Sequence, residues 1–348
     1  MSMMPKKNIV VTDCVAEEIQ SFVDALQYEG NPFEIKSHVA NWKRTGAISE
    51  LKRYFTYFYV GIYYFLKRRR YHVIVGWQQF YALIFCFFCN VFHVKKTNYV
   101  VAYNFTYKEK KGMAARIYRW FMEKCLCQKY LDCIHVPSAN YADTISVEFG
   151  FPREKIFVSQ FGVNDCYEQL SGLNPPETYK KDEYALAIGR SNRDFDFLIR
   201  AWQGMEFPLV IISDTYKGTV ESDNITLLTN VAGTESKPWI ANCGLMVIPI
   251  DDGSICSGDT VLLTAMAAAR KILVTAPSTL AEMYIEDEEN ALLTPKQETI
   301  FRQKATDALF NEKYHALGEQ ARASFLRNYS RRSMGERFFR YLNNQFVP

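Results

Sequence analysis

The sequence predicts an α/β protein built from two doubly wound domains, each a largely parallel sheet covered by helices. Its 348 residues are enough for two domains of ordinary size. Hydrophobic residues make up 48% of the chain, so each domain can bury a full core without disulfides or metals. Short apolar runs alternate with longer helix-like segments, which is typical of parallel sheets. The same composition excludes a disordered, collagen-like or coiled-coil protein.

The alternation runs through the first half of the chain and begins again after residues 173–176, Leu-Asn-Pro-Pro. In the first half we expect strands at 9–11, 73–75, 99–102 and 133–136, and helices near 15–28, 51–66, 79–92, 112–130 and 139–149. In the second half we expect strands at 184–188, 209–212, 225–228, 245–248 and 272–275. We therefore predict an N-terminal domain at 1–170 and a C-terminal domain at 171–324. A final helix, about 325–348, can pack back on the first domain.

Basic residues are concentrated in the first half of the chain. Residues 1–173 hold 22 Lys and Arg against 15 Asp and Glu, whereas residues 174–348 hold 19 against 23. Between residues 41 and 72 eight basic residues accompany a single acid, Glu50. We expect an anionic partner to bind this stretch.

The nine cysteines and the N-terminus both favour a cytoplasmic protein. The cysteines are odd in number and lie mostly in apolar runs, as reduced, buried thiols do. Cys86 and Cys89 have a metal-type spacing but no second pair, so a zinc or redox site is not expected. The first seven residues lead directly into a strand-like run with no apolar signal region, so we expect no signal peptide.

Residues 73–94 raise the question of a membrane span, because they contain no Asp, Glu, Lys or Arg. Gly76, Gln78, Gln79, Asn90 and His93 interrupt the run. We therefore predict a short strand, a glycine turn and a buried helix at 79–92, with a transmembrane span as the alternative.

The predicted helix at 51–66 is unusually aromatic, since eight of the twelve residues from 54 to 65 are Phe or Tyr. Leu51, Tyr54, Phe55 and Phe58 begin an apolar stripe at helical spacing, but Tyr57 and Tyr59 lie off it. With basic residues at both ends, this pattern favours a helix in the headgroup region of an anionic membrane. We predict membrane contact through residues 50–72. The alternative is an aromatic-rich core helix with a solvated basic end.

Two loops in the second half are rich in groups that bind anions. The strand at 184–188 is followed by Gly189, Arg190 and Arg193, and the strand at 245–248 leads to the run from Ser257 to Thr260. Glycine lets the backbone approach a ligand, a helix N-terminus offers free N–H groups, and arginines neutralise a diphosphate. The second run consists of Ser257, Gly258, Asp259 and Thr260. Structural turns, with Asp259 as a helix cap, are the alternative. Neither loop has a P-loop or GxGxxG pattern.

The order of these segments resembles the nucleotide-sugar domain of GT-B glycosyltransferases, close to family 4. The resemblance rests on the segments 189–201, 247–249, 257–274 and 282–293, and more loosely on 135–138 and 151–164. It implies two Rossmann-like domains facing a cleft, with the donor against the second domain and the acceptor against the first. The implied donor is a nucleotide-diphosphate sugar, most often UDP-linked, and no cofactor or metal is implied.

By the same resemblance, Arg190 and Arg193 would hold the diphosphate, with residues 257–260 capping it from the helix end. Family 4 enzymes commonly carry two glutamates eight positions apart around this loop, and here Cys256 and Thr264 stand in their places. The loop is similar to a side branch found in surface-polysaccharide assembly, in which Glu282 or Tyr284 would substitute.

Three further groups of residues bear on metal binding and catalysis. Asp194-Phe-Asp196 matches a DxD metal motif, but it opens a helix, where Asp is favoured electrostatically. The five histidines lack ligand spacing, so no metal site is expected. Asp13, after the first strand, and His38 are candidate catalytic bases for an acceptor hydroxyl. Asp13 could instead cap the helix expected at 15–28.

The sequence thus predicts a cytoplasmic glycosyltransferase at the inner face of a membrane. It would move a sugar, with retention, to a lipid-linked or growing glycan in surface polysaccharide or glycoconjugate biosynthesis. A GT-B enzyme with soluble substrates and a degenerate member that binds nucleotide or proteins without transfer remain alternatives. Nucleic-acid binding is not expected, because no RNP-type motif accompanies the basic stretch.

Overall fold

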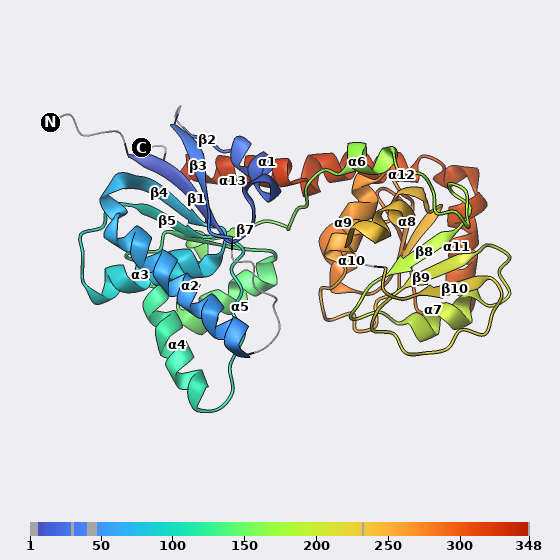
Figure 1. The fold of residues 1–348 in the computed structure, drawn as a ribbon, viewed down its shortest axis with the longest axis horizontal. Coiled ribbons are helices and arrows are strands. Elements are labelled where there is room, and N and C mark those ends of the chain that lie inside the picture. Colours follow the sequence, from blue (N-terminus) through green and yellow to red (C-terminus); the bar gives the residue numbers. More distant parts are fainter. Residues whose placement is uncertain (1–5, 29–30, 40–46, 232, 347–348) are drawn as a thin grey trace. The chain divides into compact units, whose positions relative to one another are not determined.

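The computed structural model describes residues 6–28, 31–39, 47–231 and 233–346. It divides into two compact units. Unit 1 comprises Met1–Gln160 and Arg331–Pro348, and unit 2 comprises Phe161–Ser330 (Figure 1). The chain therefore passes between the units at 160/161 and again at 330/331, where the sequence led us to expect 170/171 and 324/325.

Unit 1 contains a seven-stranded sheet in the order β2-β3-β1-β4-β5-β6-β7. All neighbouring strands are parallel except β2, which is antiparallel to β3. The strands are β1 (Lys7–Thr12), β2 (Gln27–Tyr28), β3 (Asn31–Ser37), β4 (Tyr71–Gly76), β5 (Tyr99–Ala102), β6 (Cys133–Val136) and β7 (Ile156–Val158). The four strands predicted here are present. Three others, β2, β3 and β7, were not predicted, because they are short or carry charged and proline residues in place of an apolar run.

The helices of unit 1 are α1 (Gln20–Asp24), α2 (Ala47–Leu66), α3 (Gln79–Val91), α4 (Met113–Cys125), α5 (Ala139–Phe149) and α13 (Arg331–Phe346). The prediction of one helix over 15–28 is wrong. A 3₁₀ turn at Ala16–Glu18, the short α1 and then β2 occupy this stretch. The apolar residues whose spacing suggested a long helix, Ile19, Phe22, Val23 and Leu26, are all buried. One helical turn and its flanking turns are enough to bury them.

Helix α13 packs against α1. A Cβ atom added to Gly335 would lie 2.3 Å from the carbonyl oxygen of Phe22, so the two backbones approach each other closely. Phe338 and Leu342 of α13 are completely buried. The last helix of the chain therefore completes unit 1.

Unit 2 contains a parallel six-stranded sheet in the order β10-β9-β8-β11-β12-β13. Its strands are β8 (Ala185–Ile188), β9 (Leu209–Ile212), β10 (Ile225–Leu228), β11 (Leu245–Ile248), β12 (Ile272–Thr275) and β13 (Leu292–Thr294). Its helices are α6 (Tyr167–Ser171), α7 (Phe195–Trp202), α8 (Lys237–Asn242), α9 (Asp259–Ala267), α10 (Thr279–Tyr284), α11 (Glu298–Phe310) and α12 (Leu317–Ser324). The strands predicted in this half are all present, and β13 is additional.

Both faces of the unit 2 sheet are buried. Alternate residues of one strand belong to two separate cores, Leu186 with the α9 side and Ala185 and Ala187 with the α7 and α11 side. This is the arrangement expected when helices cover both faces of a parallel sheet. The predicted doubly wound α/β fold is therefore confirmed.

Residues 73–94 form part of the unit 1 core. They contain most of β4 and all of α3, and most of α3 is buried. No helix in the described ranges is both long enough and apolar enough to cross a membrane.

Candidate functional site

The loops at the carboxyl ends of the unit 2 strands are tied to one another. Asn192, after β8, donates from Nδ2 to the carbonyl oxygens of Asp252 (3.0 Å) and Ile255 (3.3 Å) in the loop after β11. The loop after β11 is in turn held by Thr279 of α10, whose backbone N–H donates to Gly253 (2.8 Å). In doubly wound sheets this edge is where ligands bind, so these loops form the candidate donor site.

Arg193 lies at the centre of this site. Its Nη1 donates to the carbonyl oxygens of Ser191 (3.2 Å) and Asn192 (3.1 Å) and to Oγ of Ser257 (3.4 Å). Its Nε is buried without a hydrogen-bond partner, and no carboxylate in the described ranges forms an ion pair with the guanidinium. A partly buried cation that lacks a carboxylate partner favours an anionic ligand.

Burial lowers the pKa of Arg193 to about 10, and the nearby Asp259 carboxylate opposes the shift. The guanidinium therefore stays charged at neutral pH. Its partners inside the protein are neutral oxygens, which leave its charge uncompensated at short range. The site thus presents one fixed positive charge at the carboxyl edge of the sheet.

Two glycines make room for the Arg193 side chain. A Cβ atom at Gly189 would lie 2.8 Å from Nε of Arg193, and one at Gly258 would lie 2.5 Å from Nη2. Gly258 also has φ of 99°, in the left-handed region that favours glycine. The guanidinium is therefore packed between two glycines, where an added Cβ atom would force it to move.

Arg190, the other predicted phosphate ligand, has a different environment. Its side chain is 74% exposed and forms an ion pair with Asp214 in the loop after β9 (3.2 Å). Its carbonyl oxygen accepts a hydrogen bond from the Thr215 hydroxyl (2.5 Å). Arg190 is thus near the site loops but is already paired with a carboxylate.

The residues at the start of α9 have mixed roles. Asp259 is the first helical residue, and its Oδ1 accepts a hydrogen bond from the backbone N–H of Thr260 (2.8 Å). One free N–H of the helix terminus is therefore occupied by an acid of the chain itself. Ser257 contacts Arg193 and Ser191, and Gly258 precedes the helix. Of the four predicted residues 257–260, Ser257 and Gly258 lie next to the Arg193 guanidinium.

Cys256 and Thr264, which stand where the resembled family has glutamates, supply no carboxylate. Cys256 is exposed in the loop, and the Thr264 hydroxyl donates to the carbonyl oxygen of Thr260 (2.7 Å). Glu282 is exposed in the first turn of α10, whereas Tyr284 is buried and its ring packs against Tyr329. Of the two suggested substitutes, the exposed Glu282 is the accessible one.

The acids of the Asp194-Phe-Asp196 motif have structural partners. Asp194 caps α7 by accepting a hydrogen bond from the backbone N–H of Phe197 (3.0 Å). Its second oxygen forms an ion pair with Lys296 after β13 (2.5 Å). Asp196 accepts a hydrogen bond from the Tyr216 hydroxyl (2.5 Å). These contacts agree with the helix-opening interpretation of the motif.

The two candidate bases lie at the carboxyl edge of the unit 1 sheet, after the neighbouring strands β1 and β3. Oδ2 of Asp13 accepts a hydrogen bond from Nε2 of Gln78 (3.2 Å), which also donates to the Tyr57 hydroxyl (3.2 Å). Asp13 does not cap the following turn, because Val15 holds the cap position and no side chain caps it. The Asp13 carboxylate is held by Gln78, which follows β4 and which we expected only to interrupt the apolar run at 73–94.

His38 is half-buried, and its Nε2 lies 3.0 Å from the Tyr64 hydroxyl. Burial lowers the pKa of His38, so the ring is neutral at physiological pH. Its backbone N–H donates to the carbonyl oxygen of Thr12 (2.8 Å), which continues the β1–β3 pairing by one residue. His38 therefore belongs to the same edge of the sheet as Asp13.

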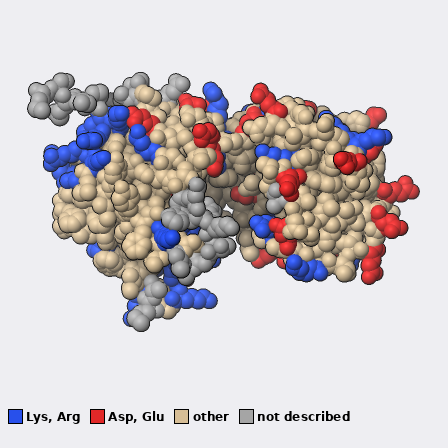
Figure 2. All heavy atoms as spheres, viewed as in Figure 1, with Lys and Arg blue, Asp and Glu red and all other residues tan. Residues whose placement is uncertain are grey.

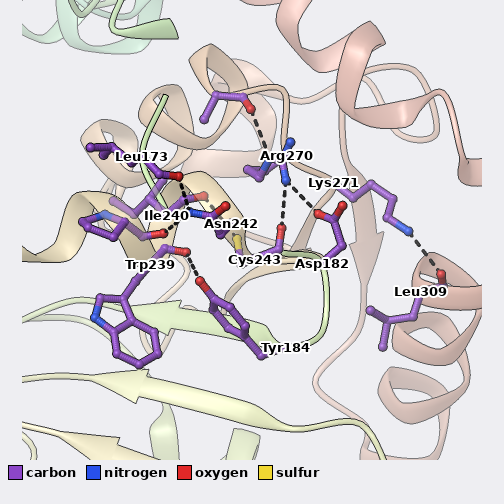
Figure 3. Close-up of polar contacts among 12 residues, drawn as sticks. Leu173, Asp182, Tyr184, Trp239, Ile240, Asn242, Cys243, Arg270, Lys271 and Leu309 are labelled. Carbon is purple, nitrogen blue, oxygen red and sulfur yellow. Dashed lines mark hydrogen bonds and ion pairs between the residues drawn. The ribbon is translucent and has the colours of Figure 1, made fainter. Parts of the chain in front are cut away.

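A cavity of about 410 Å³ lies at the opposite, amino edge of the unit 2 sheet. Three of its charged groups, Asp182, Arg270 and Lys271, make polar contacts within the chain (Figure 3). Arg270 forms an ion pair with Asp182 (2.8 Å) and donates to the carbonyl oxygen of Cys243 (3.3 Å). Lys271 donates to the carbonyl oxygens of Ala308 (2.6 Å) and Leu309 (3.2 Å) at the end of α11. The Lys271 contacts join the start of β12 to α11, and the Arg270 contacts join the residues that precede β12 to those that precede β8 and β11. The carboxyl edge is therefore the candidate site.

No family model matches the sequence, and no curated protein matches it. Solved structures match nearly the whole chain. A glycosyltransferase from Rickettsia africae ESF-5 is 12% identical with a TM-score of 0.63, and the match covers 99% of this chain and 100% of that one. HepE from Anabaena in complex with UDP is 11% identical with a TM-score of 0.60, covering 97% and 100%. Sucrose-phosphate synthase from Thermosynechococcus elongatus is 12% identical with a TM-score of 0.60, covering 98% and 99%.

Identities this low establish similarity of fold. The matches extend over both units, which agrees with two Rossmann-like domains in one chain. The chain therefore has the two-domain α/β fold of the GT-B glycosyltransferases.

Proposed function

We propose that this protein is a glycosyltransferase that takes a sugar from a nucleotide-diphosphate sugar, with UDP as the nucleotide. The observation that carries the proposal is Arg193, a cation without a carboxylate partner that is packed between Gly189 and Gly258 at the carboxyl edge of the unit 2 sheet. HepE, which has the same fold, was solved with UDP, with UDP and glucose, and with UDP-glucose. The fold and the charge at this edge together support a diphosphate ligand.

The proposed chemistry places negative charge on the leaving diphosphate as the bond to the sugar breaks. The Arg193 guanidinium would stabilise that charge, with Ser257 and the backbone at Gly258 next to it. Because the charge is fixed before the reaction, little reorganisation is needed, and a metal ion is not required for this role. Arg190 would join only by leaving Asp214, so we assign it the smaller part.

We assign the acceptor to unit 1 and propose a lipid-linked or growing glycan in surface polysaccharide or glycoconjugate biosynthesis. Asp13 or His38 would accept the proton of the acceptor hydroxyl. Of the two, Asp13 already has its carboxylate oriented by Gln78. We further propose hexosyl transfer with retention, and action at the inner face of an anionic membrane that contacts residues 50–72.

A thermal-shift screen of the full chain against UDP, GDP, ADP, CMP and their sugar conjugates tests the donor site. A ligand present at 100 times its Kd raises the free energy of unfolding by about 2.7 kcal/mol. We expect a selective shift with UDP and one UDP-sugar, absent in Arg193→Ala. Sugar transfer is then measured by release of UDP in the presence of extracted lipid-linked glycans.

Cys256 and Thr264 favour a second candidate, a protein of this fold that binds a nucleotide or a partner protein without transferring sugar. Neither side chain can do a carboxylate's work on the sugar hydroxyls. Selective UDP-sugar binding with no release of UDP under any acceptor condition would support this candidate. No stabilisation by any nucleotide would remove the donor site altogether.

A further inference from the structure

Unit 1 exposes large apolar side chains on three consecutive helices. Phe55, Tyr59 and Leu66 on α2, Phe92 just after α3, and Ile117 and Trp120 on α4 are each at least half exposed. Soluble surfaces carry single exposed apolar residues without consequence, but a group gathered on neighbouring elements marks an interaction site.

These side chains belong to one continuous surface. Helix α2 packs against α3, and α3 packs against α4 (Figure 1). Aromatic rings connect the three helices, since Phe121 of α4 lies 5.9 Å from Phe58 of α2 and 5.2 Å from Phe87 of α3 between ring centroids. At the other end, Phe65 of α2 and Phe92 stack at 5.7 Å. We call this surface, formed by α2, the end of α3 and α4, the three-helix face.

Helix α2 has most of its apolar stripe turned outward. Leu51, Phe55 and Leu66 of the stripe are 58%, 68% and 69% exposed, whereas Tyr57, Val60 and Tyr64 are buried on the opposite side. A helix that only served the core would turn its most apolar side inward. The outward stripe therefore calls for a partner outside this chain.

The three-helix face is bordered by positive charge. Residues 47–70 and 108–129 contain thirteen Lys and Arg against three acids. Arg69, Arg70, Lys110 and Lys111 are exposed and form no ion pair with a carboxylate in the described part of the chain. Figure 2 shows basic side chains at the upper left and at the lower tip of unit 1, with mostly uncharged surface between them.

We propose that the three-helix face docks on an anionic lipid bilayer. The exposed rings and aliphatic side chains enter the boundary between headgroups and acyl chains, and the bordering cations contact lipid phosphates. A symmetric pair of copies would bring two basic borders together, which disfavours a second copy as the partner. This proposal extends the proposed function and rests on it. Docking holds the acceptor-binding unit at the surface that carries a lipid-linked acceptor.

Helix α4 is the part of this face that distinguishes the proposal from contact through residues 50–72 alone. The experiment is cosedimentation of the full chain with vesicles of phosphatidylcholine, with and without phosphatidylglycerol. We expect binding only to the anionic vesicles, weakened by added salt. Ile117→Asp with Trp120→Asp, and separately Phe55→Asp with Tyr59→Asp, should each lower the partition coefficient by roughly tenfold or more, because each charge would enter the apolar boundary.

Val147→Asp is the matched control, because Val147 is 87% exposed on α5 of the same unit, outside the three-helix face. It should bind as the wild type does, and all variants should keep the wild-type melting temperature. Wild-type vesicle binding by the α4 variant would overturn the proposal. The proposal would also be overturned if the wild type does not bind vesicles and instead forms a dimer, detected by light scattering, that the same substitutions dissociate.

Nucleotide binding measured on the same samples separates this proposal from the donor site. Variants that lose vesicles but still bind UDP confirm docking as an independent property of unit 1. Vesicle binding by a protein that binds no nucleotide would leave the docking face standing and remove the proposed transfer reaction.

Discussion

Asn192 and Asp252 are joined by a reciprocal pair of hydrogen bonds. Oδ1 of Asn192 accepts from the backbone N–H of Asp252 (2.7 Å), and Nδ2 of Asn192 donates to the carbonyl oxygen of Asp252 (3.0 Å). The side-chain amide thus pairs with the backbone as a neighbouring strand would. It fixes the loop after β11, which carries Ser257 and Gly258, relative to the loop that carries Arg193.

Asn192→Ala should weaken nucleotide binding although Asn192 is not assigned to the ligand. Losing the reciprocal pair frees the loop after β11, and we expect UDP affinity to fall by about 1 kcal/mol. Isothermal titration calorimetry gives the value. Asn192→Asp is the informative comparison, because it keeps the acceptor but places a carboxylate against the carbonyl oxygens of Asp252 and Ile255. Affinity equal to wild type in Asn192→Ala would show that the loops hold their positions without this link.

Arg193→Ala should weaken UDP binding by about 1.5–3 kcal/mol, the range for a hydrogen bond to a charged group. Arg193→Lys keeps the charge but lacks the planar guanidinium, so its UDP affinity should lie between those of the wild type and Arg193→Ala. Arg200→Ala on α7, the helix that follows Arg193, is the control, since Arg200 is exposed and pairs with Glu298 on the surface (3.0 Å). Its effect on binding should stay within about 0.5 kcal/mol. Equal affinity in wild type and Arg193→Ala would remove Arg193 from the site.

Gly189→Ala and Gly258→Ala should each displace the Arg193 guanidinium. The added methyl groups would lie 2.8 Å and 2.5 Å from its nitrogens. We expect at least a tenfold loss of UDP affinity, or about 1.4 kcal/mol. Gly172→Ala is the control, because nothing lies within 4 Å of its Cβ position and its φ of −90° suits any residue. Unaltered affinity in Gly258→Ala would mean that the guanidinium can move without cost.

The free energy of unfolding should fall as the pH is lowered from about 6.5, through His135. Burial lowers the pKa of His135 to about 3. Its Nδ1 accepts from the backbone N–H of Asn104 (3.2 Å), and its Nε2 lies 2.8 Å from the carbonyl oxygen of Ser159. Both contacts suit the neutral ring with the proton on Nε2. His135 therefore binds a proton much more weakly in the folded state than in the unfolded state. Its protonation does not reduce the free energy of unfolding above about pH 6.5, and reduces it progressively as the pH is lowered towards 3.

The limiting slope for this single group is about 1.4 kcal/mol per pH unit. Denaturant unfolding at pH 7.5 and 5.5 measures the change. His38 contributes with the same sign, because burial lowers its pKa too, so His135→Gln isolates the contribution of His135. The variant should show the smaller loss between the two pH values. An equal loss in both proteins would contradict the prediction, as would a ring that titrates near pH 6.5 by NMR.

The fold could be predicted where strands are continuous apolar runs. β4, β9, β11 and β12 are almost entirely buried, so their composition alone marks them. β3 escaped detection because it carries Pro32, Glu34 and Lys36 near the edge of its sheet, where only part of the strand needs to be apolar. β7 and β13 have three residues each, which is too short for a periodicity to appear.

The candidate site was predictable in outline, because glycine and arginine after a buried strand have few structural explanations. The sequence could not rank Arg190 and Arg193, since that depends on whether a carboxylate from another loop reaches each guanidinium. Asp214 reaches Arg190, and no described carboxylate pairs with Arg193. For α2 the sequence left two interpretations open, a membrane-contacting helix and an aromatic-rich core helix, since a stripe of Phe and Leu often faces the core. In the structure Tyr57, Val60, Tyr64 and Phe65 are buried, whereas Leu51, Phe55 and Leu66 of the stripe are exposed.

The return of α13 to unit 1 has a consequence for how the protein is made. Unit 2 is one uninterrupted segment, Phe161–Ser330, whereas unit 1 needs residues from both sides of it. During synthesis the ribosome releases every strand of both sheets before Arg331 emerges. Until then Phe22 and Tyr103 lack the ring of Phe338 that packs against them, at 6.0 Å and 4.9 Å. Every element of unit 2 thus leaves the ribosome before α13, and unit 1 keeps an open hydrophobic surface until α13 packs against it.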